Sequence, residues 1–103
     1  MNLNKLMKQA QKMQEQMHKA QAELEEKTVE VKAAGGKVIV VANGAGDVIS
    51  LTIAKEIVDP EDVDFLQEAV LTGVRDAIEQ GKALAQTEMS KITGGLGAAG
   101  LGL

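Results

Sequence analysis

Apolar residues recur at alternating steps of three and four near the start of this chain. The spacing forms a heptad seam held for three repeats, with no glycine or proline inside it: Leu3, Leu6, Ala10, Met13, Met17, Ala20 and Leu24. The pattern predicts one helix of roughly 35 Å, which begins near Asn2 or Asn4 and fades near Lys27. A compact domain of this chain length has a radius of gyration of about 13 Å, so we expect the helix to project from the body.

Three short β-strands are predicted after this helix. Residues 28–34 alternate between apolar and charged side chains, which is typical of a half-buried strand. Residues 37–42 are apolar on both faces, so we expect this strand in the middle of a sheet with both sides covered. In residues 48–54, Ile49, Leu51 and Ile53 should share one face. Gly35-Gly36 predicts a two-residue hairpin and residues 43–47 predict a second turn, which together give an antiparallel meander.

A second long helix is predicted from Pro60 to about Lys91. Asp59 should cap it and Pro60 should occupy its first position. Larger apolar residues form a stripe along this helix: Leu66, Val70, Val74, Ala77, Ile78, Leu84 and Met89. A ridge of small residues beside the stripe permits close backbone approach: Gly73, Ala77, Gly81 and Ala85. The Gly-rich residues 93–103 read as a mobile tail.

This order of elements predicts a single α+β domain over residues 1–92, followed by the tail. The subunit is α-β-β-β-α, with a three-stranded antiparallel meander between two long helices. The part that can pack is near the size at which a lone core is marginal. Open sheet edges and an uncovered heptad seam add to this, so we expect a homodimer with projecting helical arms.

Composition excludes several classes of function. The 103 residues contain no cysteine, one histidine and one aromatic residue, which rules out disulfides, thiol chemistry and single-strand binding by base stacking. No run is long enough to span a bilayer, so a cytoplasmic protein is expected. His18 reads as an exposed helical histidine, the acids around residues 59–64 as helix caps, and Gly44-Ala45-Gly46 as a turn. We therefore predict no enzyme activity, metal, cofactor or small-molecule substrate.

Lysines on the outer face of the first helix are the remaining candidate site: Lys5, Lys8, Lys12 and Lys19. Lys5 and Lys8 have no acid three or four residues away, whereas Lys19 has Glu15 and Glu23 at helical spacing and should be paired. The net charge of the chain is −4, with a positive N-terminal end and an acidic middle. The residues alone leave two alternatives open, which are an ordinary solvated face and a surface for a polyanion.

The first helix strongly resembles that of the YbaB/EbfC family of bacterial nucleoid-associated proteins. The resemblance rests on residues 4–17, NKLMKQAQKMQEQM, and continues through Gly35-Gly36, the strand and turn ending at Asn43-Gly44, and Asp59-Pro60-Glu61-Asp62. It covers nearly the whole chain except the tail.

The resemblance implies a tweezer-like homodimer in the cytoplasm and nucleoid that binds duplex DNA and influences its conformation and gene expression. DNA contact carries over onto Lys5, Lys8 and Lys12, and with less support onto Lys19, Arg75, Lys82 and Lys91. Some family members carry arginines entering the third strand, where this chain has Asp47-Val48-Ile49-Ser50. This difference shifts DNA contact further toward the first helix. The alternative function is a protein-interaction module that uses coiled-coil-like, Met-rich arms.

Overall fold

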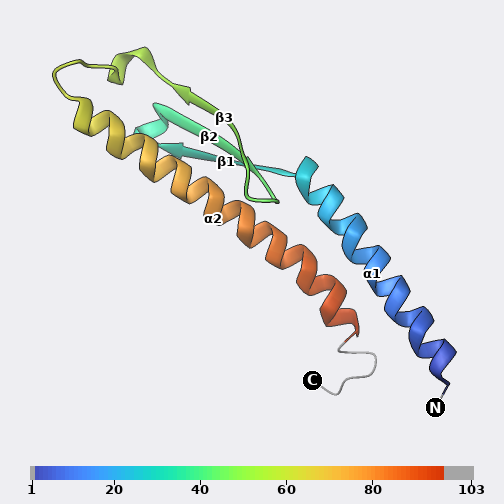
Figure 1. Cartoon of the computed structure of the whole chain (residues 1–103). Coiled ribbons are helices and arrows are strands. Elements are labelled where there is room, and N and C mark those ends of the chain that lie inside the picture. Colours follow the sequence, from blue (N-terminus) through green and yellow to red (C-terminus); the bar gives the residue numbers. More distant parts are fainter. Residues whose placement is uncertain (1, 97–103) are drawn as a thin grey trace.

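The computed structural model has a helix, a three-stranded antiparallel sheet and a second helix, as predicted (Figure 1). It describes residues 2–96. The helices are α1 (Leu3–Glu26) and α2 (Val63–Leu96), and the strands are β1 (Thr28–Ala33), β2 (Val38–Asn43) and β3 (Val48–Ile53). Two short 3₁₀ turns, η1 (Ala34–Gly36) and η2 (Lys55–Ile57), complete the α+β fold.

Helix α1 begins where the sequence places its cap. The Oδ1 atom of Asn2 accepts hydrogen bonds from the backbone N–H groups of Asn4, at 3.1 Å, and Lys5, at 3.4 Å. These bonds satisfy two of the four N–H groups that a helix leaves unpaired at its start. The helix ends at Glu26 because Lys27 adopts an extended backbone conformation.

The connection between β1 and β2 is longer than predicted. Ala33 pairs with Val38, so residues 34–37 form the turn rather than the two glycines alone. Ala34, Gly35 and Gly36 have φ angles of 51°, 65° and 89°. Two of these three left-handed positions carry glycine, which adopts such angles without steric cost.

Strand β3 departs from the predicted alternation at Ile49. Its register against β2 shifts, so that Ser50 pairs with Val41 but Val48 pairs with Ala42. Ile49 is the extra residue of a β-bulge. Leu51 and Ile53 stay in register with Val40 and Val38, whereas Ile49 has no partner in the register. The bulge therefore interrupts the predicted alternation of Ile49 with Leu51 and Ile53.

The core lies between α2 and one face of the sheet. Val38, Val40 and Ala42 of β2 point to this face and are fully buried. Ile39 and Val41 point to the opposite face and are half-buried. Within residues 2–96 no helix covers that opposite face (Figure 1), so the predicted cover on both sides of this strand is not met inside one chain.

Small residues let α2 lie close against the strands. Ala69, Gly73, Ala77 and Gly81 are its buried positions, spaced by four residues along one line. A Cβ atom at Gly73 would lie 2.9 Å from Cγ2 of Val40, closer than unstrained atoms approach. Gly73, Ala77 and Gly81 of the predicted ridge therefore form the contact together with Ala69, whereas Ala85 is half-buried. The larger apolar residues of the predicted stripe, apart from Ala77, flank this contact half-buried.

Helix α2 begins and ends later than predicted. The backbone N–H of Glu61 donates to Oδ1 of Asp59, which closes a turn before the helix, and that of Phe65 donates to Oδ1 of Asp62. Asp62, rather than Asp59, therefore caps α2, which starts at Val63. At the other end, residues 93–96 of the predicted tail continue the helix, and residues 97–103 lie outside the described residues.

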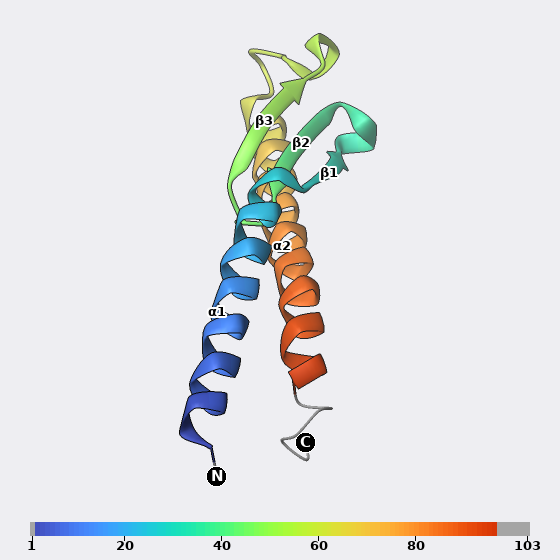
Figure 2. The same ribbon diagram turned by 90° about the vertical axis from the view of Figure 1, so that its right-hand side faces the viewer.

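The molecule is long and narrow, with principal extents of 71 × 23 × 16 Å and a radius of gyration of 19.8 Å. Helices α1 and the second half of α2 run side by side away from the sheet (Figure 2). The α1 seam is covered only near the sheet, where Leu24 is buried and Met13, Met17 and Ala20 are half-buried. At the far end Leu3 is 69% exposed. The expected projecting helix is present, and its seam faces α2 near the sheet.

Candidate nucleic-acid interface

Four lysines line the exposed surface of α1. Lys5, Lys8, Lys12 and Lys19, here called the arm lysines, all have exposed side chains. Lys5, Lys12 and Lys19 follow one another every seven residues, which places them roughly 10 Å apart along the helix axis. Duplex DNA carries one phosphate charge per about 1.7 Å of its axis, so each arm spans several phosphates.

None of the arm lysines forms an ion pair within residues 2–96. The ion pairs there join Lys27 and Lys91 to Glu88, and Lys37 to Glu56. The expected pairing of Lys19 with Glu15 or Glu23 is therefore wrong. Exposed helical pairs contribute only about 0.3–0.5 kcal/mol, which is too little to hold a long side chain in one conformation.

Charge is separated along the length of the molecule. The arm lysines lie on α1, toward the end that carries the N-terminus, whereas the acidic run lies at the opposite end, around η2 and the start of α2 (Figure 1). The run comprises Glu56, Asp59, Glu61, Asp62, Asp64 and Glu68. A net charge of −4 thus conceals one end at which positive groups face solvent.

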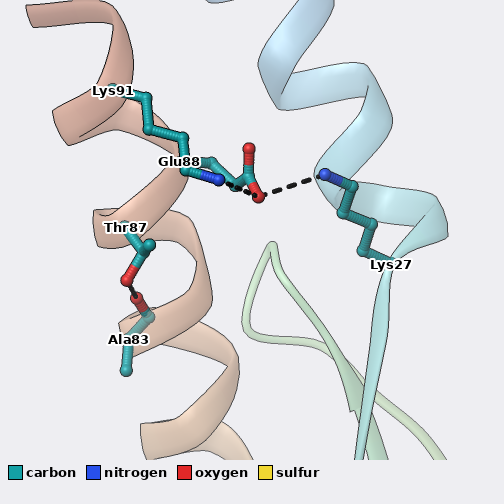
Figure 3. Close-up of polar contacts among 5 residues, drawn as sticks. All are labelled: Lys27, Ala83, Thr87, Glu88 and Lys91. Atoms are coloured by element: carbon teal, nitrogen blue, oxygen red, sulfur yellow. Dashed lines mark hydrogen bonds and ion pairs between the residues drawn. The ribbon is translucent and has the colours of Figure 1, made fainter.

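An ion-pair cluster joins α1 to α2 where α1 ends. Oε1 of Glu88 lies 3.2 Å from Nζ of Lys27 and 3.7 Å from Nζ of Lys91 (Figure 3). The hydrogen bond from Lys27, followed by the charges of Lys27 and Lys91, lowers the pKa of Glu88 below its ordinary value of 4.5. Glu88 offsets part of the charge of Lys91, so this residue is less suited to phosphate contact than the arm lysines.

Sequence reasoning missed the pairing of Lys27 with Glu88. Lys91 and Glu88 are three residues apart on a helix, and that spacing was visible. Lys27 lies between α1 and β1, and it meets Glu88 only because α2 returns alongside α1. The adjacent Thr87 donates its hydroxyl to the carbonyl of Ala83, one turn earlier in α2, at 3.0 Å (Figure 3), so this side chain is used within its own helix.

The histidine and the acidic residues form no metal-binding cluster in the part of the chain that the structure describes. His18 is exposed on α1. Among the helices in this range, none has the length and apolar character that crossing a membrane requires.

Comparison with known sequences identifies the family. A sequence model of the YbaB/EbfC DNA-binding family matches residues 1–96. The chain belongs to the YbaB/EbfC DNA-binding family.

Individual relatives of the YbaB/EbfC chain agree with this assignment. This chain is 53% identical to a nucleoid-associated protein of Ruminiclostridium cellulolyticum over 96 residues, which cover 93% of this chain and 84% of that protein. It is 52% identical to a nucleoid-associated protein of Acetivibrio thermocellus, with 93% and 85% covered.

A solved structure shares the YbaB/EbfC fold described here. The uncharacterized protein HP0035 of Helicobacter pylori superposes with a TM-score of 0.79 at 18% identity, over 90% of this chain and 98% of that one. At this identity the likeness supports the fold alone.

Proposed function

We propose that this YbaB/EbfC protein is a non-enzymatic homodimer that binds duplex DNA in the nucleoid. The arm lysines contact phosphates, and through these contacts the protein alters DNA conformation and influences gene expression. One observation carries the proposal: the arm lysines project on an exposed helix with no carboxylate partner inside residues 2–96. Family membership and the names of the relatives support DNA as the polyanion.

Phosphate contact rather than base reading follows from the chemistry of lysine. An ammonium group is a point charge without the fixed donor geometry that distinguishes bases, so it positions a protein without specifying sequence. The β2–β3 turn and β3 add no basic residue, since residues 44–53 contain none. We therefore expect binding with little sequence preference.

A second copy of the chain is supported by apolar surface that one chain leaves open. Val48, Ile49 and Leu51 of β3 are exposed, and β3 pairs with only one strand within residues 2–96. The largest fully buried side chains are the two valines Val38 and Val40. A single core of this size is marginal for stability, and pairing two chains would cover the exposed strand and present two lysine arms.

The decisive experiment removes the arm charges. Replacement of Lys5, Lys8 and Lys12 by glutamine should abolish the gel shift of duplex DNA and leave the dimer mass unchanged. In the unchanged protein, affinity should fall with salt at a log–log slope of roughly −5, if two arms together contact about six phosphates.

A matched control removes three charges at the other end of the molecule. Replacement of Lys32, Lys37 and Lys55 by glutamine lowers the net charge equally, but these residues lie on or next to the sheet, away from the arm. This variant should bind DNA nearly as well as the unchanged protein. Equal losses in the two variants, or DNA binding that persists without the arm charges, would show that the arm lysines are the wrong residues.

A protein-interaction module is the second candidate, favoured by the exposed apolar residues Leu3, Leu6 and Met7 at the arm tip. The same assay separates the two functions. A protein partner retained after nuclease treatment, with no DNA shift at low salt, would favour this alternative.

A further inference from the structure

The turn between β2 and β3 is wedged between the two helices where the arm begins. Asn43, the last residue of β2, is only 4% exposed although it is polar, and Gly44 is also buried. Figure 3 shows this turn below the Glu88 ion pairs, between α2 and the end of α1. The turn therefore lies where α1, here called the arm, joins the sheet and α2. We call this junction the arm root.

Backbone groups at the end of α1 are bound by this turn. The N–H of Gly44 donates to the carbonyl oxygens of Leu24, at 2.9 Å, and Lys27, at 3.0 Å. The side-chain Nδ2 of Asn43 donates to the carbonyl oxygen of Glu25 at 3.2 Å. A helix leaves its last four carbonyls without partners. The turn supplies donors for two of these and thus acts as a C-terminal cap from outside the helix.

The other end of the Asn43 amide holds the turn in shape. Its Oδ1 accepts from the backbone N–H groups of Ala45, at 3.0 Å, and Asp47, at 2.9 Å. One side chain therefore joins the turn to the end of α1. Because the amide is buried and uses both ends, loss of either partner carries a desolvation cost.

Close packing leaves no space for a side chain at Gly44 of the turn or at Gly81 of α2. A Cβ atom at Gly44 would lie 2.6 Å from Cδ2 of Leu24, and one at Gly81 of α2 would lie 2.3 Å from the carbonyl oxygen of Asn43. Each is shorter than real Cβ contacts. The turn is thus pressed directly against α1 on one side and the backbone of α2 on the other.

We propose that Asn43 is a positioning residue that fixes the direction in which α1 leaves the body. For DNA contact, this inference rests on the function proposed above. Helix α1 is about 36 Å long, so a rotation of about 10° at its root moves the tip by about 6 Å. That displacement exceeds the spacing of about 3.4 Å between successive phosphates of one strand along the DNA axis.

Two variants remove the donor of Asn43 while keeping an acceptor for the turn. Asn43→Asp keeps Oδ1 as an acceptor and replaces Nδ2 by a second carboxylate oxygen, and Asn43→Ser keeps one hydroxyl oxygen on a shorter side chain without added charge. The matched control Gln80→Glu makes the same amide-to-carboxylate change at an exposed position of α2. Far-UV circular dichroism verifies that each variant retains its helices and strands.

Arm direction is measured by the distance between two spin labels. The chain has no cysteine, so Gln11→Cys on the arm and Glu79→Cys on α2 accept one label each, and dilution with unlabelled chains removes distances between copies. We expect a narrow distance distribution in the unchanged protein and in Gln80→Glu. Both Asn43 variants should give a distribution at least about twice as wide, because one of the contacts that orient α1 is lost. Distributions as narrow as that of the control would overturn the proposal.

DNA affinity at fixed salt is the second measurement. We expect Asn43→Asp and Asn43→Ser to bind about tenfold more weakly than Gln80→Glu, although every arm lysine is present, because two arms of variable direction engage one duplex less effectively. A widened distribution without loss of affinity would refute the link to DNA. If the unchanged protein binds no DNA, the proposed function fails, and the label distances still decide whether Asn43 fixes the arm.

Discussion

The lysines of this chain differ in whether a carboxylate neutralises them. Lys27, Lys37 and Lys91 have acidic partners, whereas the arm lysines have none within residues 2–96. Unpaired cations near the start of a helix oppose its dipole and repel one another, at a cost of several tenths of a kcal/mol. A polyanion would relieve this cost. The arrangement of the arm lysines therefore costs helix stability and favours binding of a polyanion.

Glu88 provides a prediction on pH at the residue scale. Its pKa is lowered by Lys27 and Lys91, so the ion pairs stabilise the folded state above the ordinary pKa of 4.5 and this contribution is lost as the pH falls through the lowered value. Glu88→Gln should therefore unfold at lower urea concentration than the unchanged protein at about pH 7, and the difference should vanish near pH 2.

Glu79→Gln is the control for this measurement, because Glu79 is an exposed carboxylate on the same helix with no ion pair in the described chain. It should show little difference at either pH. If Glu88→Gln loses as much stability in acid as at neutral pH, packing rather than charge holds the side chain. Salt should also narrow the difference at neutral pH, since the cluster is partly exposed.

Helix α2 carries glycines that lower its intrinsic stability but allow it to pack closely against the sheet and the β2–β3 turn. A mid-helix glycine costs about 1 kcal/mol relative to alanine, yet Gly73 and Gly81 both lie on the face that packs against the sheet and turn. A larger side chain at either position would push the helix away from β2. The spacing of four residues keeps this narrow contact on one side of the helix.

Gly81→Ala should destabilise the protein despite the gain in helix propensity. The added methyl would lie 2.3 Å from a backbone oxygen of Asn43, which cannot move aside without shifting β2. We expect a loss of about 1–3 kcal/mol in the free energy of unfolding, measured in urea. Gly73→Ala meets the side chain of Val40 at 2.9 Å and should cost less.

The neighbouring exposed position provides the reference for this series. Gln80 lies on the solvent side of α2. Gln80→Ala should therefore change the free energy of unfolding by less than about 0.5 kcal/mol. A Gly81→Ala variant more stable than the unchanged protein would contradict the close approach of helix and turn.

At the scale of the whole molecule, shape and burial point to association. A chain 71 Å long with a radius of gyration of 19.8 Å keeps far more surface exposed than a compact domain of this size. The exposed strand β3 and the exposed tip of the α1 seam are both apolar. We therefore expect that folding is coupled to pairing of two chains.

Coupled folding and pairing should make thermal stability depend on protein concentration. A tenfold increase should raise the midpoint of unfolding by about 4 °C, since the association equilibrium contributes to stability. Light scattering should give twice the chain mass of 10.8 kDa. A midpoint independent of concentration, together with the mass of one chain, would contradict the homodimer.

The local sequence pattern by itself determined which segments form helices and strands and that α1 projects as an arm. The heptad seam, the alternation in residues 28–34, the turn glycines and the small ridge of α2 each report a periodicity or a backbone angle that neighbouring residues set. The same reasoning showed that Lys5 and Lys8 have no acid at helical spacing, whereas Lys12 has Glu15 three residues away and only the structure shows that it forms no ion pair within residues 2–96. The sequence pattern placed the start of α2 three residues early, since Asp59 and Asp62 are both competent caps and only the structure shows which one is used.

Only the tertiary structure decided how these elements meet. The bulge at Ile49, the ion pair of Lys27 with Glu88 and the wedge of Asn43 between two helices all join residues whose proximity depends on the path of the whole chain. The sequence presents Asn43-Gly44 as an ordinary turn, because turn propensity carries no information about what packs against it. The direction of the lysine arm is set there, by contacts between residues distant in sequence.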